Sequence, residues 1–327
     1  MAPQQLSVGI GLSDRMQPLL EKQVVDDRVA LDFDLSAVDN IFWRALHSDD
    51  FDVTEMSLAA YCILHSRGEN RFVGIPVFTS RMFRHNSVYV SAASNIRQPS
   101  DLAGKRIGVP EYQMTAAVWM RGILEQYHGV RARDVSWFKG GVNKPGRKER
   151  IALELPAGYR LTEIPVEDTL DDYLCSGQID ALITAKMPDS FQSGNPAVRR
   201  LFPDPLAAEE DYVRKSGLFP IMHVLVLRRE VYERDASLAR AVYDAFTAAK
   251  VYSERRLYDP DALACMVPWL ISEMEHTFAL LGRDYWPYGV SKNRNCLSVF
   301  LDYLAAQGLL RRPVGVDELF AQDLLDT

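Results

Sequence analysis

Three cationic side chains gather between two apolar runs in the segment IPVFTSRMFRHNSVYV, residues 75–90. Arg81, Arg84 and His85 are separated by only a few positions. An arginine guanidinium donates paired hydrogen bonds to a carboxylate, and a histidine exchanges a proton near neutral pH. Because both flanks are apolar, the segment predicts an anion site with proton transfer at His85. The alternative is a solvated loop with ordinary ion pairs.

A second candidate for anion binding is the segment VPEYQMTAA, residues 109–117. A helix that begins near Gln113 leaves backbone N–H groups without helical partners from about Met114 onward. Those donors, the helix dipole and the Thr115 hydroxyl suit a carboxylate or a phosphate. Ordinary helix capping explains the same residue types, so the prediction gains weight only if this segment and residues 81–85 face one cleft.

Two further candidates lie in the C-terminal half of the chain. His223 stands within the apolar run FPIMHVLVL, residues 219–227, as a satisfied structural group or as a second group for proton transfer. The aromatic residues of DYWPYG, residues 284–289, either stack on a planar ligand or pack in the core.

Two charged segments are predicted to be solvated. KGGVNKPGRKER, residues 139–150, lacks the residue order of a nucleotide-binding loop and is typical of a flexible surface loop. SEMEHT offers Glu273, Glu275 and His276 without a second histidine at ligand spacing, which favours an exposed helix face. No metal cluster is visible in the sequence.

These candidates must be positioned by the surrounding secondary structure. Along the chain, short apolar runs alternate with segments that have helical periodicity. This alternation predicts an α/β architecture. The expected elements are strands at 6–11, 29–34, 181–184 and 219–227, strands on either side of residues 81–85, and helices near 265–282 and 293–307.

The length of 327 residues predicts two lobes. We expect a discontinuous lobe I (1–92 and 222–327), completed by the C-terminal helices, and an inserted lobe II (93–221). Each lobe would hold a mixed sheet flanked by helices, with a ligand cleft between the lobes.

Composition narrows the classes of function. The net charge of −7 argues against nucleic acid as a partner, and no apolar run reaches the roughly 18 residues of a membrane span. The N-terminus lacks the features of a signal peptide, and four scattered cysteines indicate reduced thiols. A cytoplasmic protein is therefore expected. The C-terminal helices could form a homo-oligomer interface, although nothing in the sequence requires it.

Several strings spread over most of the chain, in the same order, resemble the 4,5-dihydroxyphthalate decarboxylase family. They are FDVTEMSLAAY, IPVFTSRMFRHNSVYV, LAGKRIGVPEYQMTAAVWMRGIL, WFKGGVNKPGR, GQIDALITAKMP, LFPIMHVLVLRREVY and DYWPYGV. The resemblance implies a type 2 periplasmic-binding-protein fold reused as a cytosolic enzyme. The implied reaction is the non-oxidative loss of one carboxylate from 4,5-dihydroxyphthalate, which gives protocatechuate. The first loop departs from the family pattern, because Ser13 precedes Asp14 where an aromatic residue is common.

That reaction needs an acid to protonate the ring carbon and a base near the hydroxyl group para to it. With the resemblance as guide, His85 is the expected acid, and Asp14, Glu111 or His223 is the expected base. Because an arginine on the departing carboxylate would stabilise the bound substrate, Arg81 and Arg84 are expected to hold the carboxylate that stays. No cofactor is expected, and a divalent ion recruited by the catechol remains open.

The remaining expected contacts are with the small aromatic carboxylate itself. The residues assigned to them are Ser80, Met114, Thr115, Trp119, Phe219 and Trp286. The main rival is a cytosolic solute-binding protein that holds such a carboxylate without catalysis. A transcription regulator would need a helix-turn-helix before the first strand, and a thiamin-pyrimidine synthase would need a cysteine-rich signature.

Overall fold

The computed structural model describes residues 2–327, which divide into two compact units. Unit 1 runs through Arg81 and includes Ile221–Ser298 and Val314–Thr327. Unit 2 comprises Met82–Pro220 and Val299–Pro313.

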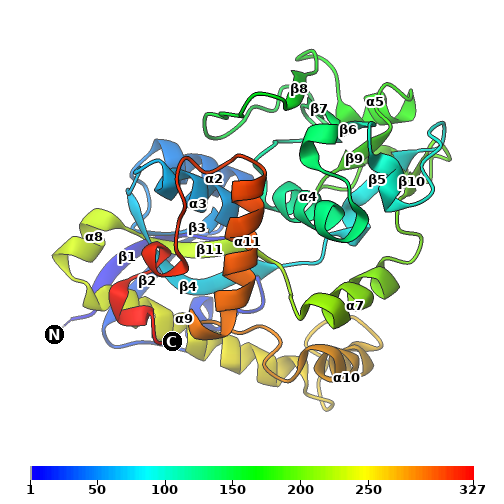
Figure 1. Cartoon of the computed structure of the whole chain (residues 1–327). Helices are drawn as coiled ribbons and strands as arrows, with labels where there is room; N and C mark the ends of the chain where they lie inside the picture. The colour runs from blue at the N-terminus through cyan, green and yellow to red at the C-terminus, as the bar shows by residue number, and fades with distance from the viewer. Residues whose placement is uncertain (1) are drawn as a thin grey trace. The chain divides into compact units, whose positions relative to one another are not determined.

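Unit 1 is built on a five-stranded mixed sheet (Figure 1). The order is β2–β1–β3–β11–β4, in which β1 is parallel to β2 and β3, and β11 is antiparallel to β3 and β4. The strands are β1 (Gln4–Gly9), β2 (Val29–Asp34), β3 (Val53–Ser57), β4 (Phe72–Arg81) and β11 (Ile221–Arg228). The helices are α1 (Gln17–Leu20), α2 (Val38–His47), α3 (Leu58–Ser66), α8 (Arg229–Arg234), α9 (Ser237–Leu257) and α10 (Leu270–Leu281).

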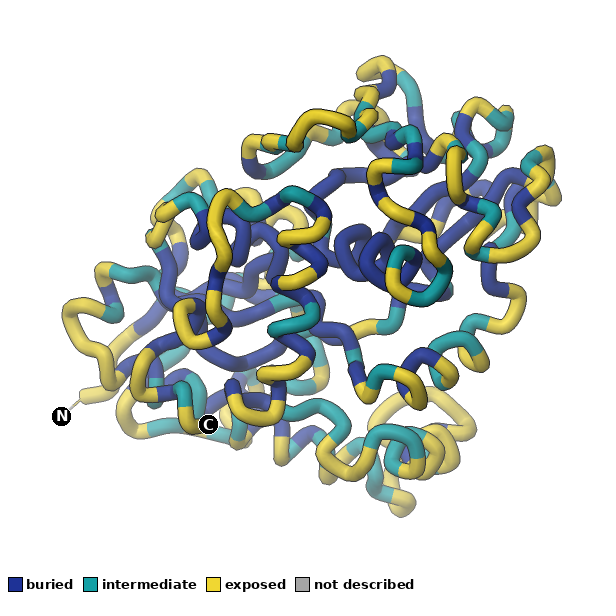
Figure 2. Tube along the Cα trace, viewed as in Figure 1, coloured by how far each residue is buried: buried dark blue, intermediate teal, exposed yellow. Residues whose placement is uncertain are grey.

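The central strands β3 and β4 of unit 1 are buried along nearly their whole length. Every residue of β3 is buried, and in β4 only Ser80 is partly exposed. Helix α3 is buried at every position, and the Ser57 hydroxyl caps it by accepting a hydrogen bond from Ala60 N–H. Figure 2 shows this buried interior in dark blue.

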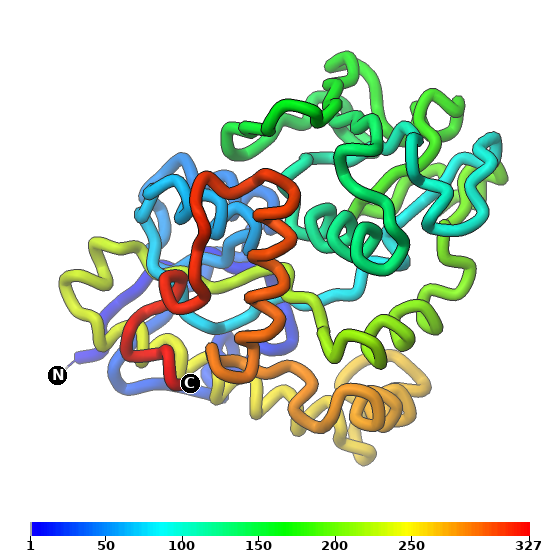
Figure 3. The backbone as a smooth tube through the Cα atoms, in the orientation of Figure 1, coloured from blue at the N-terminus to red at the C-terminus, as the bar shows by residue number. Residues whose placement is uncertain are grey.

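The C-terminal segment returns to β4, as the red end of the chain in Figure 3 shows. Gly74 forms an isolated bridge with Phe320, and a Cβ at this glycine would lie 2.4 Å from the Leu319 carbonyl oxygen. The buried Tyr61 hydroxyl accepts from Gly74 N–H at 2.9 Å and donates to that carbonyl at 2.5 Å. A glycine is therefore required where the two backbones meet.

Helix α9 is a long amphipathic helix. Leu238, Val242 and Phe246 are buried, while charged residues occupy other faces of the helix. Across residues 2–327, no helix combines the length and the apolarity needed to cross a membrane.

Unit 2 is built on a six-stranded mixed sheet in the order β10–β5–β9–β6–β7–β8. Strands β9, β6, β7 and β8 are parallel, and β5 and β10 are added in antiparallel fashion. The strands are β5 (Val88–Ser91), β6 (Arg106–Val109), β7 (Ser136–Lys139), β8 (Arg160–Glu163), β9 (Ala181–Ile183) and β10 (Val198–Arg200). The helices are α4 (Thr115–His128), α5 (Leu170–Cys175), α6 (Asp189–Gln192) and α7 (Pro205–Ser216). The 3₁₀ turn η1 (His85–Ser87) precedes β5.

Helix α4 packs closely against the second half of α11 (Arg294–Ala306). A Cβ at Gly122 would lie 2.1 Å from the Tyr303 ring, so only glycine allows this approach. After α11, the Gln307 side chain accepts from Arg121 Nε at 2.7 Å and donates to the Val118 carbonyl at 2.9 Å. These contacts attach residues 299–313 to unit 2.

The two units differ from the predicted lobe boundaries in two places. The sequence prediction kept residues 82–92 in lobe I, whereas β5 hydrogen-bonds to β9 and β10 in the sheet of unit 2. It also kept all C-terminal residues in lobe I, whereas Val299–Pro313 belongs to unit 2 through its contacts with α4. The predicted mixed sheets flanked by helices are confirmed.

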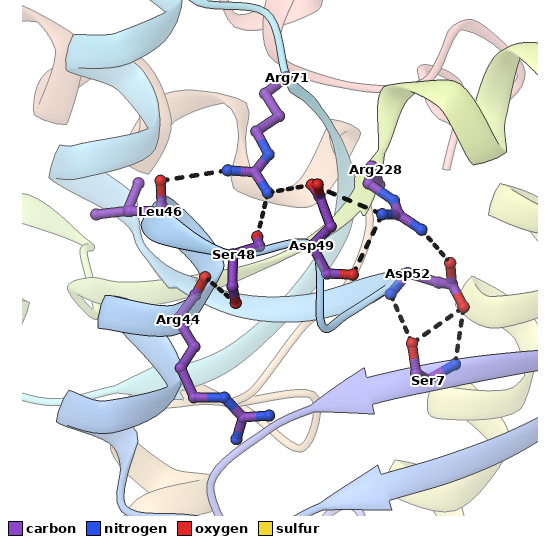
Figure 4. A network of polar contacts seen from close by, with 8 residues as sticks. All are labelled: Ser7, Arg44, Leu46, Ser48, Asp49, Asp52, Arg71 and Arg228. Carbon is purple, nitrogen blue, oxygen red and sulfur yellow. Dashed lines mark hydrogen bonds and ion pairs between the residues drawn. The ribbon is translucent and has the colours of Figure 1, made fainter.

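A polar network in unit 1 holds the loops that lead into β3 and β4 (Figure 4). Asp52 accepts from Ser7 N–H and Oγ, both at 3.0 Å, and from Arg228 Nη2 at 2.8 Å. Arg71 donates to the Leu46 and Ser48 carbonyls. Each of these groups has partners within the protein, so the network is structural.

Two aspartates in this network differ in burial and provide a matched pair of substitutions. Asp52→Ala leaves the Ser7 and Arg228 donors without an acceptor, and we expect it to lower the free energy of unfolding by about 1–3 kcal/mol. The Asp49 side chain, an ion-pair partner of Arg228, is 79% exposed. Asp49→Ala is therefore expected to lower the free energy of unfolding by only about 0–1 kcal/mol. Urea titration of both variants checks this order, and equal losses would contradict it.

Candidate active site

The carboxyl ends of β1, β3 and β4 lie at one edge of the unit 1 sheet, since these strands run parallel. Strand β11 runs the opposite way and therefore begins at this edge. His223 pairs with Ser57 at the end of β3 and with Ser80 near the end of β4. Ligands of open α/β sheets bind beyond the carboxyl ends of the parallel strands.

A buried carboxylate lies beside His223 at this edge. Glu55 Oε1 is 2.6 Å from His223 Nδ1 and accepts from Thr79 Oγ1 at 2.8 Å, while Oε2 accepts from Gly11 N–H at 2.9 Å. Burial disfavours the ionised form of Glu55, but these hydrogen bonds and the His223 charge outweigh it. The pKa of Glu55 therefore lies below its ordinary value.

The Glu55 contact determines which nitrogen of His223 is available for chemistry. An ionised carboxylate only accepts hydrogen bonds, so Nδ1 carries a hydrogen toward Glu55. The Phe42 ring meets the imidazole edge to face, with centroids 4.9 Å apart. About a fifth of the His223 side chain is exposed. In the neutral imidazole, Nε2 can accept a proton.

Arg15 lies at the same edge of the sheet, where its side chain hydrogen-bonds the backbone of β4. Its Nη2 donates to the Thr79 carbonyl at 2.9 Å, and its guanidinium lies 4.1 Å from the Trp286 ring centroid. Trp286 in turn donates to the Phe78 carbonyl at 2.8 Å, and Asp14 forms an exposed ion pair with Arg15 at 2.7 Å. Asp14 and Trp286, both predicted site residues, thus contact one cation.

Arg81 is buried in unit 1, where it hydrogen-bonds the segment DYWPYG, residues 284–289. Its Nη2 donates to the Asn293 side chain and, at 3.0 Å, to the Pro287 carbonyl. Burial lowers the pKa of Arg81 to about 10, although Cys296, Tyr288 and Asp284 act in the opposite direction. Its neighbour Ser80 is partly exposed.

Arg84 and His85 belong to unit 2, where both are buried. Burial lowers the pKa of Arg84 to about 10, opposed by Glu209. The His85 ring meets Phe202 and Tyr212 at centroid distances of 5.1 and 5.5 Å, and these residues line a pocket of about 90 Å³. Burial, with a smaller contribution from His128, lowers the pKa of His85 to about 4 against the opposing charge of Asp211.

Glu111 follows β6 in unit 2 and is almost fully buried. Arg147 contacts its Oε1 at 2.6 Å and Arg150 does so at 3.2 Å. Nearby, Glu149 accepts from Tyr112 N–H at 2.7 Å. The segment 139–150, predicted to be a solvated loop, therefore places three charged residues against the end of β6.

The other predicted contact residues of unit 2 lie either at the start of helix α4 or in stacked aromatic pairs. Met114 is the N-cap of α4 and Thr115 its first residue. Trp119 has no exposed surface, and its ring stacks on Phe300 with centroids 5.1 Å apart. Phe219 stacks on Phe83 at 4.7 Å.

Three polar residues of the unit 1 edge were not singled out from the sequence. Glu55 is the one carboxylate of a fully buried strand, and pairing it with the lone His223 was the available signal. Thr79 and Arg15 carried no comparable signal. Residues 2–327 contain no group of three or more His, Cys, Asp or Glu side chains placed to hold a metal ion.

Comparison with solved structures defines the class of fold. The chain aligns over its full length with the periplasmic aliphatic sulphonate binding protein SsuA from Escherichia coli, over 100% of both chains, with a TM-score of 0.56 and 14% identity. A sulfonate-binding SsuA from Methylobacillus flagellatus gives a TM-score of 0.55 at 13% identity, over 97% of this chain and 91% of that one. The chain therefore has the fold of the SsuA-type periplasmic binding proteins, as the sequence predicted.

Comparison of sequences defines the family within that fold. The chain is 40% identical over 320 residues to a 4,5-dihydroxyphthalate decarboxylase from Comamonas testosteroni, covering 98% of this chain and 97% of that enzyme. It is 42% identical over 209 residues to the enzyme of the same name from Pseudomonas putida, covering 64% of this chain and 81% of that one. No family model matches the chain. The chain belongs to the 4,5-dihydroxyphthalate decarboxylase family, which confirms the resemblance found in its motifs.

The lowered pKa of His85 makes a prediction about stability. Between its ordinary pKa and about 4, the unfolded chain binds a proton that the folded protein excludes, so folding loses stability as the pH falls through this range. We expect the melting-temperature advantage of the wild type over His85→Gln to shrink from pH 7 to pH 5. His47→Gln, at an exposed histidine of α2, is the control. Parallel curves for wild type and His85→Gln would contradict the prediction.

Proposed function

We propose that this protein is a carboxy-lyase that removes one carboxylate from 4,5-dihydroxyphthalate and yields protocatechuate and CO₂. The observation that carries the proposal is the 40% identity to a 4,5-dihydroxyphthalate decarboxylase over 98% of the chain. The hydrogen-bonded pair of His223 and Glu55 supports it, because the reaction requires a group that takes up a proton.

The chemistry of the substrate defines the steps that the protein must assist. Each ring hydroxyl is para to one carboxylate, so its loss of a proton pushes electrons toward the carbon that bears that carboxylate. A proton adds to this carbon, and the bond to the carboxylate then breaks to release CO₂ and restore the aromatic ring. One proton is delivered to carbon, the proton taken from the hydroxyl returns to the phenolate oxygen after CO₂ leaves, and no oxidant or reductant is needed.

We assign the uptake of the hydroxyl proton to His223. Its Nε2 is an acceptor because Nδ1–H is directed to Glu55, and the negative charge of Glu55 stabilises the imidazolium that forms. The carboxylate thus acts through the histidine. Of the three bases considered from the sequence, Asp14 is exposed and Glu111 is paired with two arginines.

We assign recognition of the carboxylate that stays on the ring to Arg15. Arg81 and Arg84 were the sequence-based choices, and the Arg81 guanidinium already donates to Asn293 and Pro287. Arg15 lies beside Thr79, which also binds Glu55, and Trp286 holds its guanidinium flat. A cation on the retained carboxylate assists binding without stabilising the one that leaves.

The proposal is tested by incubating the purified protein with 4,5-dihydroxyphthalate and measuring released CO₂ and protocatechuate. Phthalate, which lacks the hydroxyl groups, should release none. Dialysis against a chelator before the assay reports whether a divalent ion is needed. Binding of 4,5-dihydroxyphthalate without CO₂ release would overturn the proposal in favour of a solute-binding protein.

The role of His223 is tested by His223→Asn, since the asparagine amide can still donate to Glu55 while Nε2 is lost. We expect kcat to fall by about 10²–10⁴-fold, the usual contribution of a positioned base. Calorimetry with 4,5-dihydroxyphthalate should show binding retained. His47→Asn is the matched control, and a His223→Asn variant with kcat within threefold of the wild type would place the base elsewhere.

A further inference from the structure

Strand β4 contains a bulge directly before the carboxyl edge of the unit 1 sheet. The register between β4 and β11 shifts between His223 and Leu225, so that residues 76–79 of β4 lie opposite Val224 alone. Pro76 suits this position because a proline has no N–H to offer to a neighbouring strand. Bulges redirect side chains and backbone groups, and they are frequent beside active sites.

Backbone carbonyls of this bulge accept hydrogen bonds from side chains. The Phe78 carbonyl accepts from the Trp286 indole at 2.8 Å, and the Thr79 carbonyl accepts from Arg15 Nη2 at 2.9 Å. The Arg15 guanidinium lies 4.1 Å from the centroid of the same indole. The bulge therefore holds both the cation and the ring against which this cation packs.

The Thr79 side chain connects the bulge to the buried carboxylate of β3. Thr79 is only 7% exposed, and its hydroxyl donates to Glu55 Oε1 at 2.8 Å. The same oxygen lies 2.6 Å from His223 Nδ1. Burial raises the pKa of Glu55, but the hydrogen bonds from His223, Gly11 and Thr79, together with the His223 charge, outweigh it. Thr79 thus helps to keep ionised the carboxylate that orients His223.

We propose that Thr79 is a positioning residue for the decarboxylation, with its hydroxyl holding Glu55 and its carbonyl holding Arg15. The proposal rests on the proposed function, in which His223 takes up the hydroxyl proton and Arg15 holds the carboxylate that stays. These two groups need a fixed separation, because the hydroxyl that loses its proton is meta to the retained carboxylate. Thr79 supplies this constraint by contacting Arg15 directly and His223 through Glu55. A misplacement of about 1 Å is enough to slow a reaction that depends on such positioning.

The positioning role is tested by Thr79→Val, which removes the hydroxyl and keeps the carbonyl. We expect kcat to fall by about 10–100-fold because Glu55 is held less firmly, with KM for 4,5-dihydroxyphthalate within about threefold of the wild type because Arg15 keeps its acceptor. Thr79→Ser restores the hydroxyl and should recover most of kcat. Thr162→Val, at an exposed position of β8, is the matched control. A Thr79→Val kcat within threefold of the wild type, or a serine variant no faster than the valine variant, overturns the proposal.

The contact between Thr79 and Glu55 has a readout that does not depend on activity. Loss of the Thr79 donor raises the pKa of Glu55 toward its ordinary value. A carboxyl whose pKa is lowered by folding stabilises the protein above its unfolded pKa, and this stabilisation is lost as the pH falls through the folded pKa. The melting-temperature advantage of the wild type over Thr79→Val should therefore shrink from pH 7 to pH 4, with Thr79→Ser following the wild type. Parallel curves for the wild type and Thr79→Val overturn the proposal. If the wild type releases no CO₂ but the advantage shrinks, the proposed function and the positioning role fail while the hydrogen bond to Glu55 stands.

Discussion

The buried charge of Glu55 is the constraint on which the functional edge of unit 1 depends. An ionised carboxylate removed from water costs several kcal/mol unless donors replace the lost hydration. Three donors do so here, Gly11 N–H, Thr79 Oγ1 and His223 Nδ1, and each comes from a different part of the chain. Satisfying one charge therefore orders the loop after β1 and the ends of β4 and β11 around β3. The orientation of the His223 ring is a consequence of this requirement.

Polar groups elsewhere in unit 1 show what distinguishes a structural network from a reactive one. Asp52 accepts hydrogen bonds from Ser7 and Arg228 at 2.8–3.0 Å within unit 1 (Figure 4). At the carboxyl edge, about a fifth of the His223 side chain is exposed, and Nδ1 is the ring nitrogen that contacts Glu55. Buried donors and acceptors that pair with one another hold loops in place, whereas a partly exposed group on a rigid strand is available for chemistry.

The fold could be predicted from the sequence to a large extent because its strands are apolar runs and its helices carry regular stripes. The run at 29–34 matches β2, and the helices expected near 265–282 and 293–307 contain α10 and α11. The candidate site was harder to predict. Glu55 and His223 are 168 residues apart, and their contact exists only because β11 is inserted between β3 and β4. Local patterns do not determine that strand order.

The cationic segment that first indicated an anion site shows how the surroundings of neighbouring residues can differ. Arg81, Arg84 and His85 are close in sequence, but the boundary between the units falls after Arg81, so their contacts are with different partners. Arg81 binds Asn293 in unit 1, while His85 packs on Phe202 and Tyr212 in unit 2. Burial lowers the pKa of all three because each is largely removed from water. Proximity in sequence therefore does not by itself give neighbouring side chains the same packing partners.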